Sequence, residues 1–190
     1  MSKRSDAIKN EKLIIKTANE LFNMYGVDSI SMKKIAEAAQ IGKGTLYRHF
    51  SNKSDICSAL LSQEIEHMFN QIDYKKKIQT DQQELLRFIF LSLIEIMEKN
   101  VSLIKEIERS DKKNRVLMQT PFYVKLKSEV MSCITKMDIV NDPDFHADIL
   151  LNSFSADVFE YQHYVKKIPS KQFVDRILKI FVRGIQSSKL

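Results

Sequence analysis

The sequence predicts an all-α protein, and three observations support this prediction. Apolar residues recur at helical spacing in successive segments along the 190 residues. In the segment Leu85–Met97, ten of thirteen residues are apolar and point to all sides of a helix, which predicts an element that is buried on most faces. No run of alternating β-branched residues between turn signals indicates a strand. We expect two helical domains, formed by residues 1–51 and 52–190.

The first predicted helix spans about four turns and has one apolar face. Apolar residues recur along it at i, i+4, i+7, i+8 and i+11, the pattern of an amphipathic helix. Gly26 follows at a place where helices commonly end. The residues of the apolar face are Ile14, Ala18, Leu21, Phe22 and Tyr25.

A short helix is expected next, from about Ser31 to Ala39, with Ser31 as a favourable N-cap residue. Its apolar face has the spacing i, i+3, i+4 and i+7 and consists of Met32, Ile35, Ala36 and Ala39. Gln40, Ile41 and Gly42 then form a tight connection, in which Ile41 packs between two helices and Gly42 tolerates a sharp turn. Two short helices joined by such a turn are the layout of a helix-turn-helix domain, which binds DNA.

The second helix of this pair is expected to have opposite buried and exposed faces. Leu46 and Phe50 lie four residues apart and face the core. Gly44, Thr45 and Arg48 point most directly away from that core, so we predict that they face the bases of the major groove. Gly44 has no side chain and would allow the helix to approach the bases closely.

Four further residues are predicted to contact DNA phosphates. Tyr47 and His49 lie to either side of the buried stripe, where the phosphate backbones would pass. Lys43 and Lys53 add positive charge, and Lys53 stands in the first turn of the next helix, where free backbone N–H groups also favour a phosphate. For Tyr47, the alternative is packing against the preceding short helix.

The segment Leu13–Ile56 resembles the DNA-binding domain of the TetR/AcrR transcriptional regulators. Four motifs carry the resemblance in order, namely ANELFNMYG, SMKKIAEAA, GKGTLYRHF and NKSD. The rest of the chain matches that family only in length and helical pattern. The family usually has glycine where this chain has Gln40, so Gln40 is expected to adopt a left-handed conformation at a cost of about 1 kcal/mol.

The charge distribution agrees with a nucleic-acid partner. The formal net charge is +6, and residues 1–56 contain 10 Lys and Arg against 6 Asp and Glu, so positive charge is concentrated in the predicted DNA-binding domain. A basic N-terminal arm would add phosphate or minor-groove contacts, and its residues are Lys3, Arg4, Lys9 and Lys12. The alternative is a solvated, frayed terminus, and truncation would distinguish the two.

The two cysteines, Cys57 and Cys133, form no CxxC motif, and the N-terminus has no signal-peptide pattern. We therefore expect a cytoplasmic protein with two reduced, structural thiols. A redox-sensing Cys133 is the alternative, although Lys136 is the one neighbour that favours a thiolate. The apolar segment Leu85–Met97 is too short to span a bilayer, so no membrane partner is expected.

The second domain is predicted to contain six helices. Pro143 and Pro169 stand at the N-terminal positions that proline favours, and Pro121 marks a break between helices. The predicted ranges are Asn52–Lys76, Asp81–Lys99, Val101–Met118, Pro121–Lys136, Pro143–Lys167 and Ser170–Ser187.

The last helix has more apolar surface than one small core requires, which favours an interface between two copies of the chain. The predicted interface residues are Phe173, Ile177, Ile180, Phe181, Val182 and Ile185. The family resemblance implies that the last two long helices pair with their symmetry mates in a four-helix bundle. It thereby implies a homodimer that binds a palindromic DNA operator.

The resemblance also implies a small-molecule effector that is bound by the second domain and releases the protein from DNA. Aromatic and methionine side chains are typical of adaptable apolar pockets, so the effector is expected to be apolar or amphipathic. The candidates are Phe88, Met97, Met118, Phe122, Tyr123, Phe154 and Tyr161, with His146 and His163 as polar anchors. The alternative for each of them is an ordinary place in the core.

No metal site and no cofactor are expected. Asp142, Asp144, His146 and Asp148 lie within seven residues, but their spacing directs them to different sides of a helix, and acidic residues at a helix N-terminus favour capping. The sequence contains no GxGxxG, HExxH or GxSxG motif, so we do not expect an enzyme.

The sequence thus predicts a ligand-responsive DNA-binding transcriptional regulator, and the family resemblance favours a repressor. The predicted architecture is an N-terminal helix-turn-helix domain followed by a helical domain for effector binding and dimerisation. A protein of the same fold that organises chromosomes or controls division is the alternative. Genome-wide occupancy would distinguish them, because a regulator binds a few promoters and an organiser binds many dispersed sites.

Overall fold

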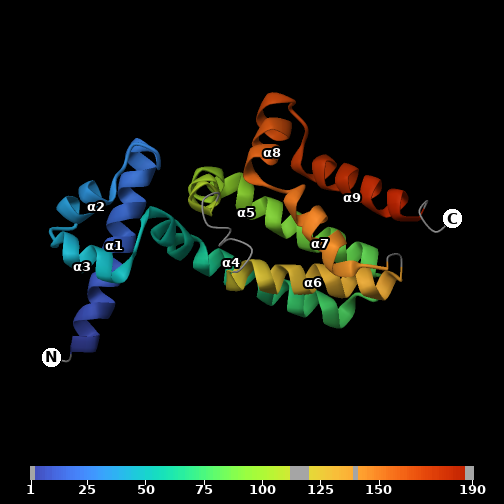
Figure 1. The fold of residues 1–190 in the computed structure, drawn as a ribbon, viewed down its shortest axis with the longest axis horizontal. Coiled ribbons are helices and arrows are strands. Elements are labelled where there is room, and N and C mark those ends of the chain that lie inside the picture. The colour runs from blue at the N-terminus through green and yellow to red at the C-terminus, as the bar shows by residue number, and fades with distance from the viewer. Residues whose placement is uncertain (1–2, 112–119, 139–140, 187–190) are drawn as a thin grey trace. The chain divides into compact units, whose positions relative to one another are not determined.

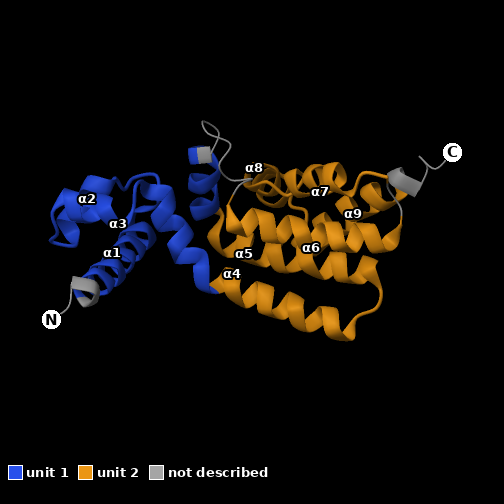
Figure 2. Ribbon diagram, turned by 60° about the horizontal axis from the view of Figure 1, so that its bottom comes forward, with its two compact units in different colours: residues 1–63, 102–114 blue, residues 64–101, 115–190 orange. Residues whose placement is uncertain are grey.

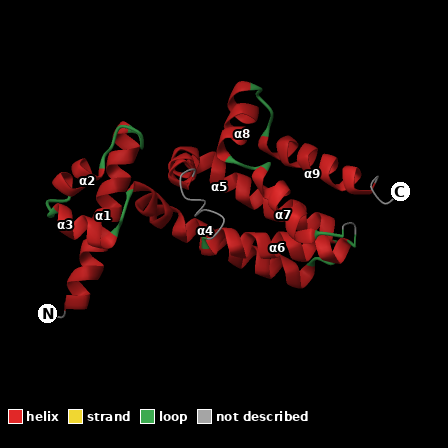
Figure 3. Ribbon diagram, viewed as in Figure 1, coloured by secondary structure: helices red, strands yellow, loops and turns green. Residues whose placement is uncertain are grey.

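The computed structural model describes residues 3–111, 120–138 and 141–186, and every regular element in these ranges is helical, as predicted (Figure 3). Figure 1 labels the elements in chain order. They are α1 (Lys3–Tyr25), α2 (Met32–Ala38), α3 (Lys43–His49), α4 (Lys53–Ile78), α5 (Gln82–Asp111), α6 (Pro121–Met137), α7 (Pro143–Asn152), α8 (Ala156–Glu160), the π-helix η2 (Tyr161–Val165) and α9 (Ser170–Gln186).

The chain forms two compact units, which Figure 2 shows in different colours. Unit 1 contains the chain up to Gln63 and the segment that begins at Ser102, and unit 2 contains residues 64–101 and 115–190. The chain therefore leaves unit 1 within α4 and returns to it within α5. The predicted boundary of the DNA-binding domain, between residues 51 and 52, lies at the start of α4 and stays a prediction, because compactness alone does not define a DNA-binding domain.

The core of unit 1 joins α1, α2, α3 and the first turns of α4. Most of the predicted apolar stripes supply it, with α2 and α3 each adding residues that are less than a tenth exposed. Tyr25 is the exception in the stripe of α1, because its side chain is 57% exposed. Leu103 and Ile107, from the last part of α5, pack against the same core. The buried residues are Ile14, Ala18, Phe22, Val27, Ile30, Ile35, Ala36, Leu46, Phe50, Ile56 and Cys57.

Gln40 forms the corner between α2 and α3 in the predicted left-handed conformation, with φ at 53°. Its N–H donates to Glu37 O (3.1 Å), and the N–H of Ile41 donates to Ala36 O (3.0 Å). This pair of hydrogen bonds is a Schellman motif, which satisfies carbonyls at the end of α2 and requires the left-handed residue. The predicted end of α1 is also confirmed, since Gly26 has φ at 78° and donates to Phe22 O (2.9 Å).

Unit 2 is built around the first part of α5. The segment Leu85–Met97 is buried on most sides, as predicted. The helix is interrupted at Asn100, which has φ −133° and ψ 24° and whose amide donates to Ile96 O (3.1 Å) and Glu64 Oε2 (3.0 Å). Nearer the start of α5, Arg87 donates two hydrogen bonds of 2.6 and 3.3 Å to Asp175 of α9.

The single helix predicted for Pro143–Lys167 is wrong, because α7 ends at Asn152 and α8 begins at Ala156. The Asn152 amide and the Ser153 hydroxyl donate back to the carbonyls of Asp148 (2.8 Å) and Ile149 (3.0 Å). Such side-chain bonds compete with the helical pattern and favour a break. Phe154 is then buried and stacks on Phe90, with 4.2 Å between ring centroids.

Replacing Gln40 by glycine is expected to stabilise the protein by about 1 kcal/mol, because glycine adopts a left-handed conformation without a Cβ clash. Thermal or urea unfolding measures the change. Gln63→Gly is the matched control, since Gln63 is exposed inside the regular helix α4, where glycine is expected to cost about 1 kcal/mol. A loss of stability in Gln40→Gly would contradict the strain assigned to this corner.

Candidate nucleic-acid interface

The helices α2 and α3 begin at residues that the sequence marks as helix starts. Ser31 caps α2, as predicted, by accepting the N–H of Lys34 at 3.3 Å. Gly42 precedes α3 in an extended conformation (φ −66°, ψ 144°) and makes no side-chain cap. The short connection between the helices therefore leads directly into α3, the predicted recognition helix.

The two faces of α3 differ as the periodicity predicted. Leu46 is fully buried and Phe50 is 7% exposed, whereas Gly44 and Arg48 are exposed and Thr45 is half-buried. A Cβ built on Gly44 meets no atom within 4 Å. The fold of the described residues thus leaves space beside Gly44, and the assignment of Gly44, Thr45 and Arg48 to DNA bases stays a prediction.

The predicted phosphate contacts fall into two groups. Lys43 is exposed, and Tyr47 is 52% exposed, so packing against α2 does not bury its side chain. His49 is half-buried, and its Nε2 atom is shielded from solvent without a hydrogen-bond partner among the described residues. Lys43 and Tyr47 are therefore open to a ligand, while one nitrogen of His49 faces the interior.

Lys53 points inward, so its ammonium already has partners within the protein, and its predicted phosphate contact stays a prediction. Its Nζ atom donates to Val27 O at 2.9 Å and lies 3.5 Å from the carboxylate of Glu106. Its side chain is only 16% exposed. The sequence pattern gave no sign of this, because Glu106 is distant in sequence from Lys53.

Both thiols are buried, in agreement with a structural role. Burial, followed by the nearby charge of Glu106, raises the pKa of Cys57 to about 12. Burial and the charge of Glu129 raise the pKa of Cys133 to about 11. Both groups are therefore protonated thiols near neutral pH, and neither has the thiolate character of a redox sensor.

Three of the residues predicted to line an effector pocket are packed in the core of unit 2. Met97, Tyr123 and Phe154 are buried. The ring of Phe154 contacts that of Phe173, with 5.4 Å between their centroids, and it also stacks on the ring of Phe90. Phe88 and Phe122 are half-buried, and Tyr161 is 48% exposed. Met118 lies outside the described residues. The assignment of these residues to an effector pocket stays a prediction.

The two histidines that were predicted as polar anchors bond within the protein. His146 Nδ1 lies 2.6 Å from Asp142 O, and its ring contacts Phe181 edge-on. His163 Nδ1 lies 3.1 Å from Ile168 O, and its ring stacks on Phe159. Capping by Asp142 is confirmed, because its carboxylate accepts the N–H of Phe145 at 3.0 Å.

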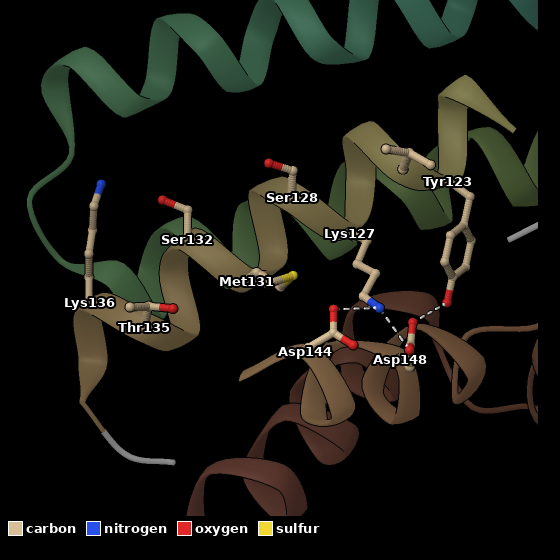
Figure 4. Close-up of a pocket in the computed structure, with 10 residues that line it drawn as sticks. Tyr123, Lys127, Ser128, Met131, Ser132, Thr135, Lys136, Asp144 and Asp148 are labelled. Atoms are coloured by element: carbon tan, nitrogen blue, oxygen red, sulfur yellow. Dashed lines mark hydrogen bonds and ion pairs between the residues drawn. The ribbon is translucent and has the colours of Figure 1, made fainter. Parts of the chain in front are cut away.

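An open groove of about 660 Å³ runs between α6 and α7 (Figure 4). Tyr123 is the one predicted pocket residue that lines it. Val124, Lys127, Ser128, Met131, Ser132, Thr135, Lys136, Asp144 and Asp148 complete the lining. The exposed surface of the groove is thus mainly apolar, although hydroxyl-bearing and charged residues contribute most of the side chains that line it.

A charged cluster closes one side of this groove, and the dashed lines of Figure 4 mark its bonds. Lys127 Nζ lies 2.9 Å from Asp144 and 2.8 Å from Asp148, and the Tyr123 hydroxyl donates to Asp148 at 2.9 Å. Burial and this hydrogen bond raise the pKa of Tyr123. Although partial burial acts to raise the pKa of Asp148, the bonds from Lys127 and Tyr123 lower it below its ordinary value. The cluster therefore ties α6 to α7.

The residues predicted for a dimer interface differ in exposure. Phe173 and Val182 are buried in unit 2, and their assignment to an interface stays a prediction. Ile177 and Phe181 are half-buried, Ile180 is 73% exposed, and the side chain of Ile185 lies outside the described residues.

Sequence reasoning missed two exposed apolar residues of α7, Phe145 and Ile149, which are 57% and 50% exposed. Their i, i+4 spacing places them on one face, whereas Ala147, Leu150 and Leu151 are buried. A helix with apolar residues on more than its buried face was the signal that could have identified them.

Among the described residues, no helix combines the length and hydropathy that crossing a membrane requires.

Comparison with known proteins supports the assignment of the chain to DNA-binding transcriptional regulators. The family described as "Bacterial regulatory proteins, tetR family" matches residues 14–60. An HTH-type transcriptional regulator of Staphylococcus aureus (strain MRSA252) is 30% identical over 186 residues, which cover 95% of this chain and 96% of that protein.

Two solved structures show the same fold. FadR of Thermus thermophilus, a TetR family transcriptional repressor in complex with lauroyl-CoA, matches with a TM-score of 0.74 and 15% identity over 92% of this chain and 94% of that one. RolR in complex with resorcinol matches with a TM-score of 0.66 and 17% identity over 97% and 96% of the two chains. With its helix-turn-helix domain, its all-α architecture and its curated relatives, the chain belongs to the TetR family of bacterial transcriptional regulators.

Proposed function

We propose that the protein is a ligand-responsive repressor that binds a palindromic operator as a homodimer and leaves it when a small molecule binds. The observation that carries this proposal is the geometry of α3. Its Leu46 and Phe50 are held in the core, while Gly44 and Arg48 are exposed on the other side. A short helix fixed in this way can enter the major groove with its free face toward the bases.

Within this proposal, Thr45 and Arg48 contact bases and Gly44 lets the backbone approach them. Lys43 and Tyr47 contact phosphates, and they are the exposed members of the predicted set. His49 contributes through the ring atoms other than its buried Nε2. Base contacts supply specificity and phosphate contacts set the register on the duplex.

Homodimerisation would place two copies of α3 in successive major grooves, roughly 34 Å apart. The exposed apolar residues Phe145, Ile149 and Ile180 of α7 and α9 are surface that a second copy could cover. A dimer on a promoter blocks transcription without an activating surface, which is why repression is the proposed outcome.

The proposed effector is a small apolar or amphipathic molecule that favours the conformation with lower DNA affinity. FadR of Thermus thermophilus binds lauroyl-CoA and RolR binds resorcinol, which supports an effector with an apolar or aromatic part. The aromatic core of unit 2, including Phe90, Phe154 and Phe173, could accommodate one by rearranging its rings. The groove between α6 and α7 offers a second surface, where apolar area lies beside hydroxyl and charged groups.

A regulatory role is favoured over an enzymatic one because the curated relatives are named as transcriptional regulators. The same names favour regulation over chromosome organisation or division control. A bacterial regulator of this kind acts in the cytoplasm, where the DNA lies.

The direct test is titration of the purified protein, at stated salt, against the DNA upstream of its own gene and against a random duplex of equal length. We expect a preference of at least about a thousandfold for the upstream DNA, with two protomers per site. Equal and strongly salt-dependent binding to both would contradict autoregulation. Genome-wide occupancy would then decide between an operator elsewhere and the non-regulatory alternative.

Arg48→Ala is expected to weaken specific binding by about 1–3 kcal/mol and to relax base preference at one position, if Arg48 contacts a guanine. Lys43→Ala is the matched comparison, because loss of a phosphate contact weakens specific and random DNA alike and reduces the salt slope by about one. Arg48→Ala with an unchanged ratio of specific to random affinity would refute the base contact.

Gly44→Ala is expected to separate stability from DNA binding. Beyond its chain neighbours and the adjacent backbone of α3, the added methyl group meets no atom of the protein within 4 Å. It also improves helix propensity, so stability stays the same or rises by up to about 1 kcal/mol. The same methyl group would meet the DNA, and we expect at least about a tenfold loss of affinity. Gln40→Gly is the control, because it stabilises the same domain without adding atoms to the exposed face of α3. Unchanged affinity in Gly44→Ala would remove α3 from close contact with the bases.

A further inference from the structure

The last part of α5 belongs to unit 1, although it is far from α1–α3 in sequence. Figure 2 gives the segment after Ser102 the colour of unit 1. Leu103 and Ile107 of this segment pack against the core that holds α3. Partial burial of these two apolar side chains against that core stabilises the segment's position.

An ion pair at the start of α4 adds to these apolar contacts. The ammonium of Lys53 lies 3.5 Å from the carboxylate of Glu106, and the two side chains are 16% and 19% exposed. The same ammonium donates to Val27 O at 2.9 Å. Lys53 therefore joins the loop after α1, the first turn of α4 and the last part of α5. Because both charges are largely shielded from water, removal of either one leaves the other without its partner.

A second pair on this segment is more exposed. Arg109 donates to Asp28 at 2.6 Å, with side chains that are 50% and 74% exposed. Exposed pairs of this kind contribute little, because solvent screens them. The Lys53–Glu106 pair is the better-shielded ionic contact of the two.

The start of α4 is closely coupled to the end of α3. Only Phe50, Ser51 and Asn52 separate the two helices. The carboxylate of Asp55 accepts the N–H groups of Ser51 (2.8 Å) and Asn52 (3.3 Å), and Asn52 Oδ1 accepts the N–H of Asp55 at 3.0 Å. These reciprocal bonds make the connection stiff, so displacement of the first turn of α4 would displace the C-terminal end of α3.

We propose that Lys53 and Glu106 are positioning residues for DNA binding, which hold α3 in its binding orientation by fixing the start of α4 to the end of α5. Lys53 acts through Val27 and Glu106 and does not contact a phosphate. This inference rests on the proposed function, since its main readout is DNA affinity.

The test compares Lys53→Met and Glu106→Gln with the wild-type protein. Methionine keeps the apolar length of the lysine stem, and glutamine keeps the size of Glu106, so both variants remove charge with little change of volume. Glu95→Gln is the matched control, because Glu95 lies on the same helix in an exposed pair with Lys99, at 2.9 Å and with side chains 66% and 60% exposed.

DNA affinity is measured at a temperature where every variant is folded, over a range of salt concentrations. We expect both variants to lose about tenfold in specific affinity, with little change for random DNA and no change in the salt slope. Glu95→Gln binds as the wild type does. A salt slope reduced by about one in Lys53→Met alone would assign Lys53 to a phosphate and overturn the proposal. Unchanged specific affinity in Glu106→Gln would also overturn it.

The two cysteines provide a readout that does not depend on DNA. Cys57 is fully buried in unit 1, where its thiol senses the charges of Glu106 and Lys53, and Cys133 is buried in unit 2. We expect Glu106→Gln and Lys53→Met to increase the rate of Cys57 alkylation by about tenfold through local opening, with Cys133 unchanged. Equal Cys57 labelling in all variants would overturn the positioning role. If the wild-type protein bound no DNA specifically, the proposed function would fail. Selective Cys57 labelling in the variants would still show that the Lys53–Glu106 pair fixes the start of α4.

Discussion

Burial of one face of α3 is the constraint on which the rest of unit 1 depends. The helices α2 and α3 have seven residues each, and helices of that length are not stable alone in water. They keep their conformation because Ile35, Ala36, Leu46 and Phe50 share a core with α1 and α4. The exposed side of α3 can therefore carry residues chosen for a partner, including a glycine that weakens the helix.

The same constraint explains why this unit was more predictable than unit 2. In short amphipathic helices, spacing alone distinguishes core residues such as Leu46 from exposed ones such as Arg48, and both orientations were found as expected. The left-handed Gln40 was also predictable, because the family pattern places glycine there. The inward position of Lys53 was not, since it depends on Glu106, which folding brings from a distant part of the chain.

In unit 2, periodicity identified buried residues without showing what they pack against. Met97 and Phe154 are buried whether they line a cavity or fill a core, and in this structure Phe154 stacks on Phe90. The break after α7 depended on two side chains, Asn152 and Ser153, that bond to preceding carbonyls. Such residues also occur in unbroken helices, so their effect could not be inferred from residue type.

The return of α5 to unit 1 bears on how regulators of this kind could be recombined. A hybrid made by joining residues 1–51 to the effector domain of another protein would lack Ile56, Cys57, Leu103 and Ile107, which complete the core around α3. The transplanted piece would carry all the predicted base contacts and yet expose apolar surface that the original chain covers. Exchange of operator specificity between relatives is therefore simpler through the exposed face of α3 than through a cut in the chain, because that face can change while the discontinuous core remains intact.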